Sequence, residues 1–226
     1  WDVFAERQQI PYLPFKAFMF KNLSQTYSIS EAGRNYFIQQ FGNEFSSHIS
    51  VSRLGKFNNR VPNMQKEGQS ITMCSCSNII PLKRIHCIID ILAELETDFQ
   101  IHWIHFGEGP LRQDIEQYAQ TRLQRTQVEF RGIVPNTQIL DYYASNYIDL
   151  FINVSSSEGI PVSIMEALSA GILVVATNVG GTSEAVSETC GFLLPENFEI
   201  HDAAKKNKNY ISLPKEQQQE YRKNAY

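Results

Sequence analysis

The sequence predicts an α/β protein whose main part is a Rossmann-like, doubly wound parallel sheet beginning at about residue 66. Short apolar runs typical of buried strands alternate with stretches whose apolar residues recur at helical spacing. This alternation indicates a parallel sheet covered on both faces, and right-handed crossovers make such a sheet doubly wound. The 226 residues are 42% hydrophobic and 19% charged, which suits one large domain plus a smaller piece.

Two βα units open the predicted sheet. Ser70–Cys76 is strand-like, and a loop through Pro81 leads to Arg84–Leu95, where apolar residues recur at helical spacing. Gln100–Phe106 is the next strand, and Leu111–Leu123 is a helix with one apolar face. The remaining predicted elements, in chain order, are a strand at Val128–Arg131, a helix at Asn136–Tyr143, a strand at Leu150–Val154, a helix at Ile164–Ala170 and a strand at Leu173–Thr177.

Polar residues and glycines follow each predicted strand. In an open α/β sheet the ligand crevice lies beyond the carboxyl ends of the strands, where glycines let the backbone approach a ligand. For any one of these glycines taken alone, a tight turn is the favoured explanation. The segments at the five strand ends are Ser77-Asn78 with Lys83, Gly107–Gly109, Gly132–Pro135, Ser155–Val162 and Asn178–Gly181.

Two glutamates, Glu158 and Glu166, bracket the predicted start of a helix at Pro161. Proline suits a first helical turn, which leaves the amides of Val162 and Ser163 free to meet an anion. Carboxylates accept hydrogen bonds from vicinal hydroxyls, so the pair predicts a clamp for a nucleotide sugar. The alternative is that Glu158 is a capping acid and Glu166 is solvated or in a salt bridge. The apolar neighbours of Glu166 argue against simple solvation.

Composition and the remaining reactive side chains exclude several function classes. A net charge of −4 gives no reason to expect nucleic acid as a partner, and no apolar run is long enough to span a bilayer. Trp1 is followed by neither a basic start nor a long apolar core, so we expect no signal peptide. Four cysteines without CxxC spacing favour packing thiols and a reducing cytoplasm, and His102 and His105 are better explained as core or rim residues than as catalysts.

The segment from Glu158 to Glu166, EGIPVSIME, carries a family resemblance together with Ala176–Gly181 and Glu184. It resembles the Glu-x7-Glu donor-site signature of the retaining GT-B glycosyltransferases of family 4, also called glycosyl transferase group 1. The similarity extends back through Gly107–Pro110, Phe130–Gly132 and Pro81–Lys83 and covers roughly residues 23 to 200.

The resemblance implies a role for each matching residue. Glu166 would hold the ribose hydroxyls, Glu158 would orient the transferred hexose, and Lys83 would neutralise the diphosphate. The sugar and diphosphate would meet the backbone amides of the segment Gly159, Ile160, Pro161 and Val162, in which Pro161 has no N–H to donate. Gly107 would line the same donor site. Ile133 and Val134 would contact the base through their backbone.

One position departs from the family pattern. Many relatives carry an arginine five residues before the phosphate lysine, and this chain has Asn78 there. Arg84 could substitute in part, although a side chain adjacent to Lys83 would normally point elsewhere. No Asp-x-Asp metal motif is present, so we expect Lys83 and the helix dipole to replace a divalent cation, with no cofactor besides the donor substrate.

The ends of the chain suggest a piece of a larger enzyme. Tyr27–Ser30, Glu31–Phe41 and His48–Gly55 look like the last strand, helix and strand of the acceptor-binding lobe. Residues 1–60 would be a remnant of that lobe and 66–226 the donor-binding domain. Gln217–Tyr226 resembles the start of a truncated closing helix, and the absence of an initiating Met also suggests an excised piece.

Three functions remain open at this point. The resemblance implies a cytoplasmic transferase that moves a hexosyl group, with retention, from a nucleotide diphosphate sugar to a sugar or lipid-linked acceptor in surface polysaccharide or glycoconjugate synthesis. Peripheral association of the full-length protein with the inner face of the membrane would fit a lipid-linked acceptor. The alternatives are a nucleotide-sugar-binding module without turnover and a nucleotide-sugar 2-epimerase of the same architecture.

Overall fold

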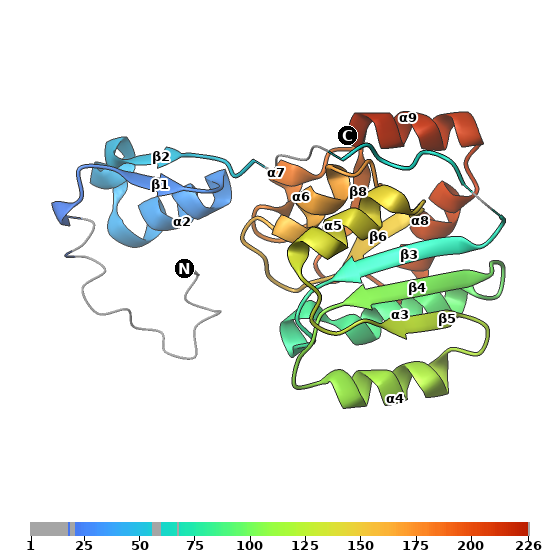
Figure 1. Ribbon diagram of the computed structural model, residues 1–226. Coiled ribbons are helices and arrows are strands. Elements are labelled where there is room, and N and C mark those ends of the chain that lie inside the picture. The colour runs from blue at the N-terminus through green and yellow to red at the C-terminus, as the bar shows by residue number, and fades with distance from the viewer. Residues whose placement is uncertain (1–17, 19–20, 56–59, 67, 226) are drawn as a thin grey trace.

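The computed structural model describes residues 18, 21–55, 60–66 and 68–225, and within these residues its main part is a six-stranded sheet (Figure 1). The strand order is β5-β4-β3-β6-β7-β8, and every neighbouring pair is parallel. The strands are β3 (Ile71–Cys76), β4 (Ile101–Phe106), β5 (Gln127–Phe130), β6 (Leu150–Asn153), β7 (Val174–Thr177) and β8 (Gly191–Leu194). This arrangement confirms the predicted doubly wound parallel sheet.

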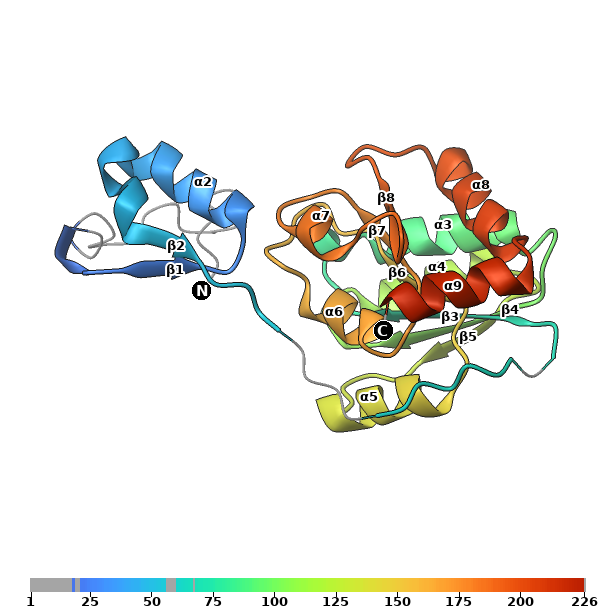
Figure 2. The same ribbon diagram turned by 90° about the horizontal axis from the view of Figure 1, so that it is seen from above.

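Helices cover both faces of the sheet (Figure 2). Helices α3 and α8 pack with α4 on one face, and α5 and α6 pack on the other. The bounds are η3 (Pro81–Lys83), α3 (Ile85–Leu95), α4 (Arg112–Arg122), α5 (Asn136–Ser145), α6 (Val162–Leu168), α7 (Thr182–Ala185), α8 (Ile200–Ile211) and α9 (Lys215–Ala225).

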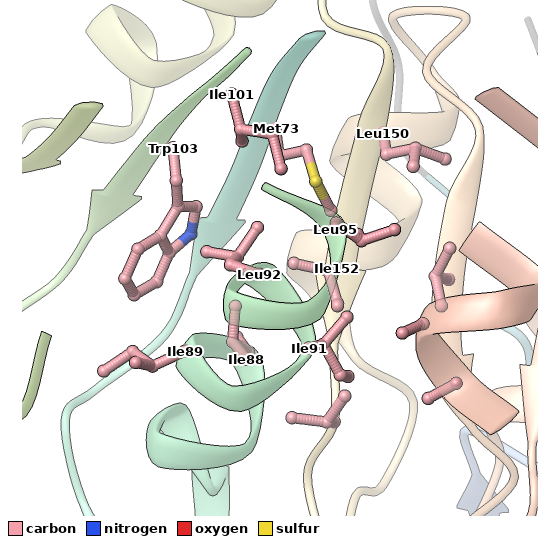
Figure 3. Close-up of a cluster of buried hydrophobic side chains, with 14 of the residues drawn as sticks. Met73, Ile88, Ile89, Ile91, Leu92, Leu95, Ile101, Trp103, Leu150 and Ile152 are labelled. Atoms are coloured by element: carbon pink, nitrogen blue, oxygen red, sulfur yellow. The ribbon is translucent and has the colours of Figure 1, made fainter. Parts of the chain in front are cut away.

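Alternation along each strand divides the core into two clusters. Met73 and Trp103 face α3, as Figure 3 shows, whereas Cys74 and Ile104 belong to the cluster on the α5 side. All four side chains are fully buried. Because apolar packing covers both faces of the sheet, a ligand can reach it only at the strand ends.

The structure contains one strand that the sequence patterns did not predict. Strand β8 pairs with β7 at the edge of the sheet, with Val174 opposite Gly191. The short helix α7 precedes its residues, GFLL, in place of a long amphipathic helix, so the alternation of helix and strand that marks the other strands is absent there. Helix α9 begins at Lys215, two residues before the predicted Gln217.

A small unit built from β1, α2, η2 and β2 precedes the main sheet, with bounds Thr26–Ser28, Glu31–Phe41, Asn43–His48 and Ile49–Val51. β1 and β2 pair in parallel, so the predicted strand, helix and strand are confirmed. The rest of the predicted remnant at 1–60, namely residues 1–17, 19, 20 and 56–59, lies outside the described residues, as does Tyr226. Within the described part of the chain, no helix combines the length and apolar character needed to cross a membrane.

Candidate functional site

The predicted crevice lies where the strand order reverses, at the carboxyl ends of β3 and β6. These strands are neighbours in the sheet although β4 and β5 lie between them in sequence. The strand arrows in Figure 1 point toward the side on which the β1-α2-β2 unit lies. Ligands of doubly wound sheets bind at such a switch point. The loop after β3 carries Lys83, and the loop after β6 carries Glu158.

Lys83 and Glu158 form an ion pair across this crevice. Lys83 Nζ lies 2.5 Å from Glu158 Oε1, although the residues are 75 positions apart. Their side chains are 19% and 10% exposed. The side-chain amide of Asn153, the last residue of β6, donates from Nδ2 to the same carboxylate oxygen at 3.3 Å. The site therefore brings together the two residues predicted to act on the diphosphate and the hexose, and Asn153 is a neighbour that the sequence reasoning missed.

Arg84 stabilises the loop after β6 and is not positioned as a second phosphate cation. Its guanidinium donates to the backbone carbonyls of Val154 at 2.6 Å, Glu196 at 2.9 Å and Ser155 at 3.2 Å. It also stacks over the ring of Phe198. Arg84 adopts the left-handed conformation, with φ of 47°, which is costly for a residue with a side chain. The expectation that Arg84 substitutes in part for an arginine at position 78 is therefore not supported.

Glu166 lies on the buried face of α6, which begins directly after Pro161 as predicted. Only 4% of the residue is exposed, and Asn136 Nδ2 donates to its Oε1 at 2.8 Å. This burial excludes the alternative of a simply solvated carboxylate. Asn136 begins α5, and a polar residue directly after Pro135 was the sequence signal that could have identified it. The asparagine fixes one carboxylate oxygen and thereby the orientation of the side chain.

The segment Gly159–Val162, which leads into α6, is held by the loop after β7. The amide of Gly181 donates to the carbonyl of Gly159 at 2.7 Å. Gly180 has φ of 56°, and a Cβ at this position would collide with the carbonyl of Glu158, so only glycine allows this contact. Ile160 and Pro161 are buried, whereas Val162 is exposed at the start of α6.

The ends of β3, β4 and β5 form the other side of the crevice. Gly107 donates to the carbonyl of Gly132 at 2.9 Å and has φ of 141°, and a Cβ there would collide with the carbonyl of Ser77. Asn78 follows Ser77 and is exposed. Ile133 is 85% exposed, while Val134 packs against the core cluster on the α5 side. Contact of this loop with a base stays a prediction.

A buried polar network lies directly beneath Ser77. His105 Nδ1 lies 2.8 Å from Ser75 Oγ, and His105 Nε2 lies 3.1 Å from the carbonyl of Ser77. Trp103 Nε1 donates to Ser75 Oγ at 3.0 Å. Burial lowers the pKa of His105 to about 4, so the ring is neutral and donates from Nε2. His105 thus supports the loop after β3 as a core residue, in agreement with the sequence interpretation.

The cysteines and the acidic residues offer no metal centre in the part of the chain that the structure describes. No group of three or more His, Cys, Asp or Glu side chains there is placed to hold a metal ion. Burial raises the pKa of Cys76 to about 11 and raises that of Cys74 further, so neither forms a thiolate near neutral pH. Both behave as packing residues.

Several known proteins are similar to this chain in sequence. The family model described as "Glycosyl transferases group 1" matches residues 58–226. The chain is 26% identical over 119 residues to a phosphatidylinositol N-acetylglucosaminyltransferase subunit from Arabidopsis thaliana, covering 52% of this chain and 26% of that protein. It is 29% identical over 163 residues to the putative colanic acid biosynthesis glycosyltransferase WcaL of Salmonella typhimurium, covering 66% of this chain and 39% of WcaL.

A solved structure extends the similarity to the small unit. Anabaena HepE in complex with UDP-glucose superimposes with a TM-score of 0.71 and 21% identity, over 92% of this chain and 59% of HepE. The chain spans well under half the length of the two curated relatives named above.

Proposed function

The chain belongs to the glycosyl transferases group 1 family, and on this premise we propose that the protein to which it belongs transfers a hexosyl group from a nucleotide diphosphate sugar, with retention, to a sugar or lipid-linked acceptor. One observation carries the proposal: Lys83 and Glu158 meet at the switch point of the sheet, and α6, the helix that follows Glu158, carries a buried Glu166 that Asn136 orients. An ammonium group and two carboxylates at one crevice match the diphosphate and the two sets of hydroxyls of such a donor.

Each residue has a separate role in this proposal. Glu166 accepts hydrogen bonds from the ribose hydroxyls, and Asn136 keeps its carboxylate in place. Lys83 binds the diphosphate and Glu158 binds the hexose. The backbone at Gly159–Val162 lines the sugar and diphosphate, and Ile133 and Val134 lie beside the base. The UDP-glucose complex of HepE, which has this fold, supports a nucleotide-sugar donor.

We further propose an exchange of partners at the ion pair when the donor binds. In the free protein the ammonium group of Lys83 pairs with the carboxylate of Glu158. The diphosphate therefore replaces Glu158 as the partner of Lys83 when the donor binds. That exchange releases the Glu158 carboxylate as an acceptor for hexose hydroxyls. During transfer, a positive charge already directed at the leaving diphosphate stabilises the charge that develops on it. We propose that Lys83 performs this role without a divalent metal.

The acceptor and the cellular setting are further parts of the proposal. The names of the two relatives, which concern phosphatidylinositol and colanic acid, support an acceptor that is lipid-linked or a growing glycan. We place the reaction in surface polysaccharide or glycoconjugate synthesis, in the cytoplasm, with the full-length protein associated peripherally with the inner face of the membrane.

A binding panel tests the donor site. Ligand-observed NMR with UDP-, GDP- and ADP-sugars should identify one base that binds in competition with its nucleoside diphosphate. Glu166→Gln should then weaken binding of that nucleotide by about 1.5 to 3 kcal/mol, the range for a hydrogen bond to a charged group, while the fold stays intact. Unchanged affinity in the folded variant would disprove the ribose assignment.

A product assay separates the remaining alternatives. The full-length protein, incubated with donor, acceptor and a chelator, should form a glycoside with the donor's anomeric configuration. An epimerised donor without acceptor would instead identify a 2-epimerase, and binding without any product would identify a binding module. Transfer that stops when chelator is added would show that Lys83 does not replace a metal.

A further inference from the structure

Glu184 joins the main sheet domain to the β1-α2-β2 unit. Its carboxylate accepts hydrogen bonds from the backbone amides of Glu31 at 3.0 Å and Ala32 at 3.1 Å, the first two residues of α2. Arg53, which follows β2, lies 3.3 Å from the same carboxylate. Glu184 is therefore in contact with two segments of the small unit, although more than 130 residues separate it from each.

The contact has the chemistry of a helix cap supplied by another part of the chain. The first amides of a helix have no partner within it, and the helix dipole favours a negative charge at that end. Ser30 Oγ accepts from the amide of Gly33 at 2.9 Å, which leaves Glu31 and Ala32 to Glu184. Burial alone would raise the pKa of Glu184, but these amides and Arg53 outweigh it and hold the pKa below its usual range.

The same segment contacts the loop that is proposed to hold the hexose. Gly181, three residues before Glu184, donates to the carbonyl of Gly159. A Cβ on Gly181 would lie 3.1 Å from the Cβ of Ser30, so the backbone there packs directly on the start of α2. The loop after β7 is thus in contact with the donor loop on one side and with the small unit on the other. In Figures 1 and 2 the β1-α2-β2 unit lies beside α6 and α7.

We propose that Glu184 is a positioning residue that holds the β1-α2-β2 unit against the donor loop, so that occupancy of the donor site and closure of the two parts of the protein strengthen each other. This inference rests on the proposed function for the identity of the ligand, and it assigns Glu184 a role beyond that site. Glu184 does not touch the donor. It acts through α2 and through the Gly159–Gly181 hydrogen bond.

The coupling follows from linkage. A donor that orders the Gly159 loop also orders the backbone of Gly181, to which α7 and Glu184 are attached, and this favours the capped arrangement of α2. Reciprocity requires that the Glu184 contact strengthen donor binding by the same factor by which the bound donor strengthens the contact. Removal of the contact should therefore weaken donor binding. The Lys83 and Glu166 contacts remain intact in that case, so the donor still binds, with reduced affinity.

Amide exchange measures the contact directly. Exchange at Glu31 and Ala32 should rise about tenfold or more in Glu184→Ala, since a hydrogen bond to a charged group is lost, and by a smaller factor in Glu184→Gln, which keeps one acceptor oxygen. Core amides such as those of Met73 and Ile104 should not change, which excludes general destabilisation. Ser30→Ala is the matched control: it keeps the Cβ beside Gly181, and it should release only the amide of Gly33.

The second measurement is affinity for whichever of UDP-, GDP- or ADP-glucose the wild-type chain binds. Glu184→Ala should lower it several-fold, Ser30→Ala should not, and the bound nucleotide should slow exchange at Glu31 and Ala32 in the wild type. Unchanged exchange in Glu184→Ala, or donor affinity that is unaffected by the loss of the contact, overturns the inference. If none of the three nucleotides binds the wild type, the proposed function fails. In that case faster exchange at Glu31 and Ala32 still supports Glu184 as the joint between the two parts, and unchanged exchange refutes it.

Discussion

Lys83→Ala tests whether this lysine is the cation that binds the donor diphosphate. The side chain is mostly buried, and its ammonium group lies 2.5 Å from Glu158 in the free protein. A hydrogen bond to a charged group contributes about 1.5 to 3 kcal/mol, so the affinity for a nucleoside diphosphate should fall about 10- to 150-fold. A nucleoside has no phosphate for Lys83 to contact, so its affinity should stay the same.

Titration calorimetry with the nucleoside and the nucleoside diphosphate, on wild type and variant, measures both affinities. Lys66→Ala provides a matched control. Lys66 pairs with Asp149 at 2.7 Å, with side chains 21% and 6% exposed, but these residues precede β3 and β6 and so lie at the opposite end of the strands. Both variants leave a buried carboxylate without its cation and should lose stability similarly. Equal loss of affinity for both ligands in Lys83→Ala, or the same loss in Lys66→Ala, would refute the reasoning.

Three further predictions concern Glu158, Arg84 and Glu96. Glu158→Gln frees Lys83, so calorimetry should find nucleoside diphosphate binding slightly tighter, while the sugar nucleotide loses its advantage over the diphosphate; weaker diphosphate binding would contradict the exchange of partners. Arg84→Ala should lower the free energy of unfolding by about 1 to 3 kcal/mol in chemical denaturation, and Arg84→Lys should rescue little because lysine lacks the forked donors. Burial alone would raise the pKa of Glu96, but the loop amides before β5 that donate to this carboxylate outweigh it and hold the pKa low. The stability that Glu96 contributes should be complete above about pH 4.3 and lost as pH falls through its folded-state pKa, and Glu96→Gln should flatten this acid limb of the unfolding curve.

The amino-acid sequence by itself determined the fold class and the site's charged residues. Strand-length apolar runs and helical periodicity are local properties, so the parallel sheet could be predicted from β3 to β7 without the structure. The Glu-x7-Glu segment is also local, because Glu158, Pro161 and Glu166 belong to one loop and one helix. Strand β8 was missed because no long amphipathic helix precedes it, and only pairing with β7 makes its residues a strand.

The tertiary structure alone decided which groups meet. Parallel strands require long crossovers, so residues far apart in sequence meet at the carboxyl edge of the sheet, and no local pattern records their distance. This is why the Lys83 pairing with Glu158 and the support that Asn136 gives Glu166 were not predicted. Arg84 shows the same limit: its neighbour Lys83 suggested a phosphate cation, but a left-handed backbone directs its guanidinium to carbonyls after β6. The Glu184 cap on α2 joins segments that are 152 and 153 positions apart in sequence, so no local pattern could reveal it.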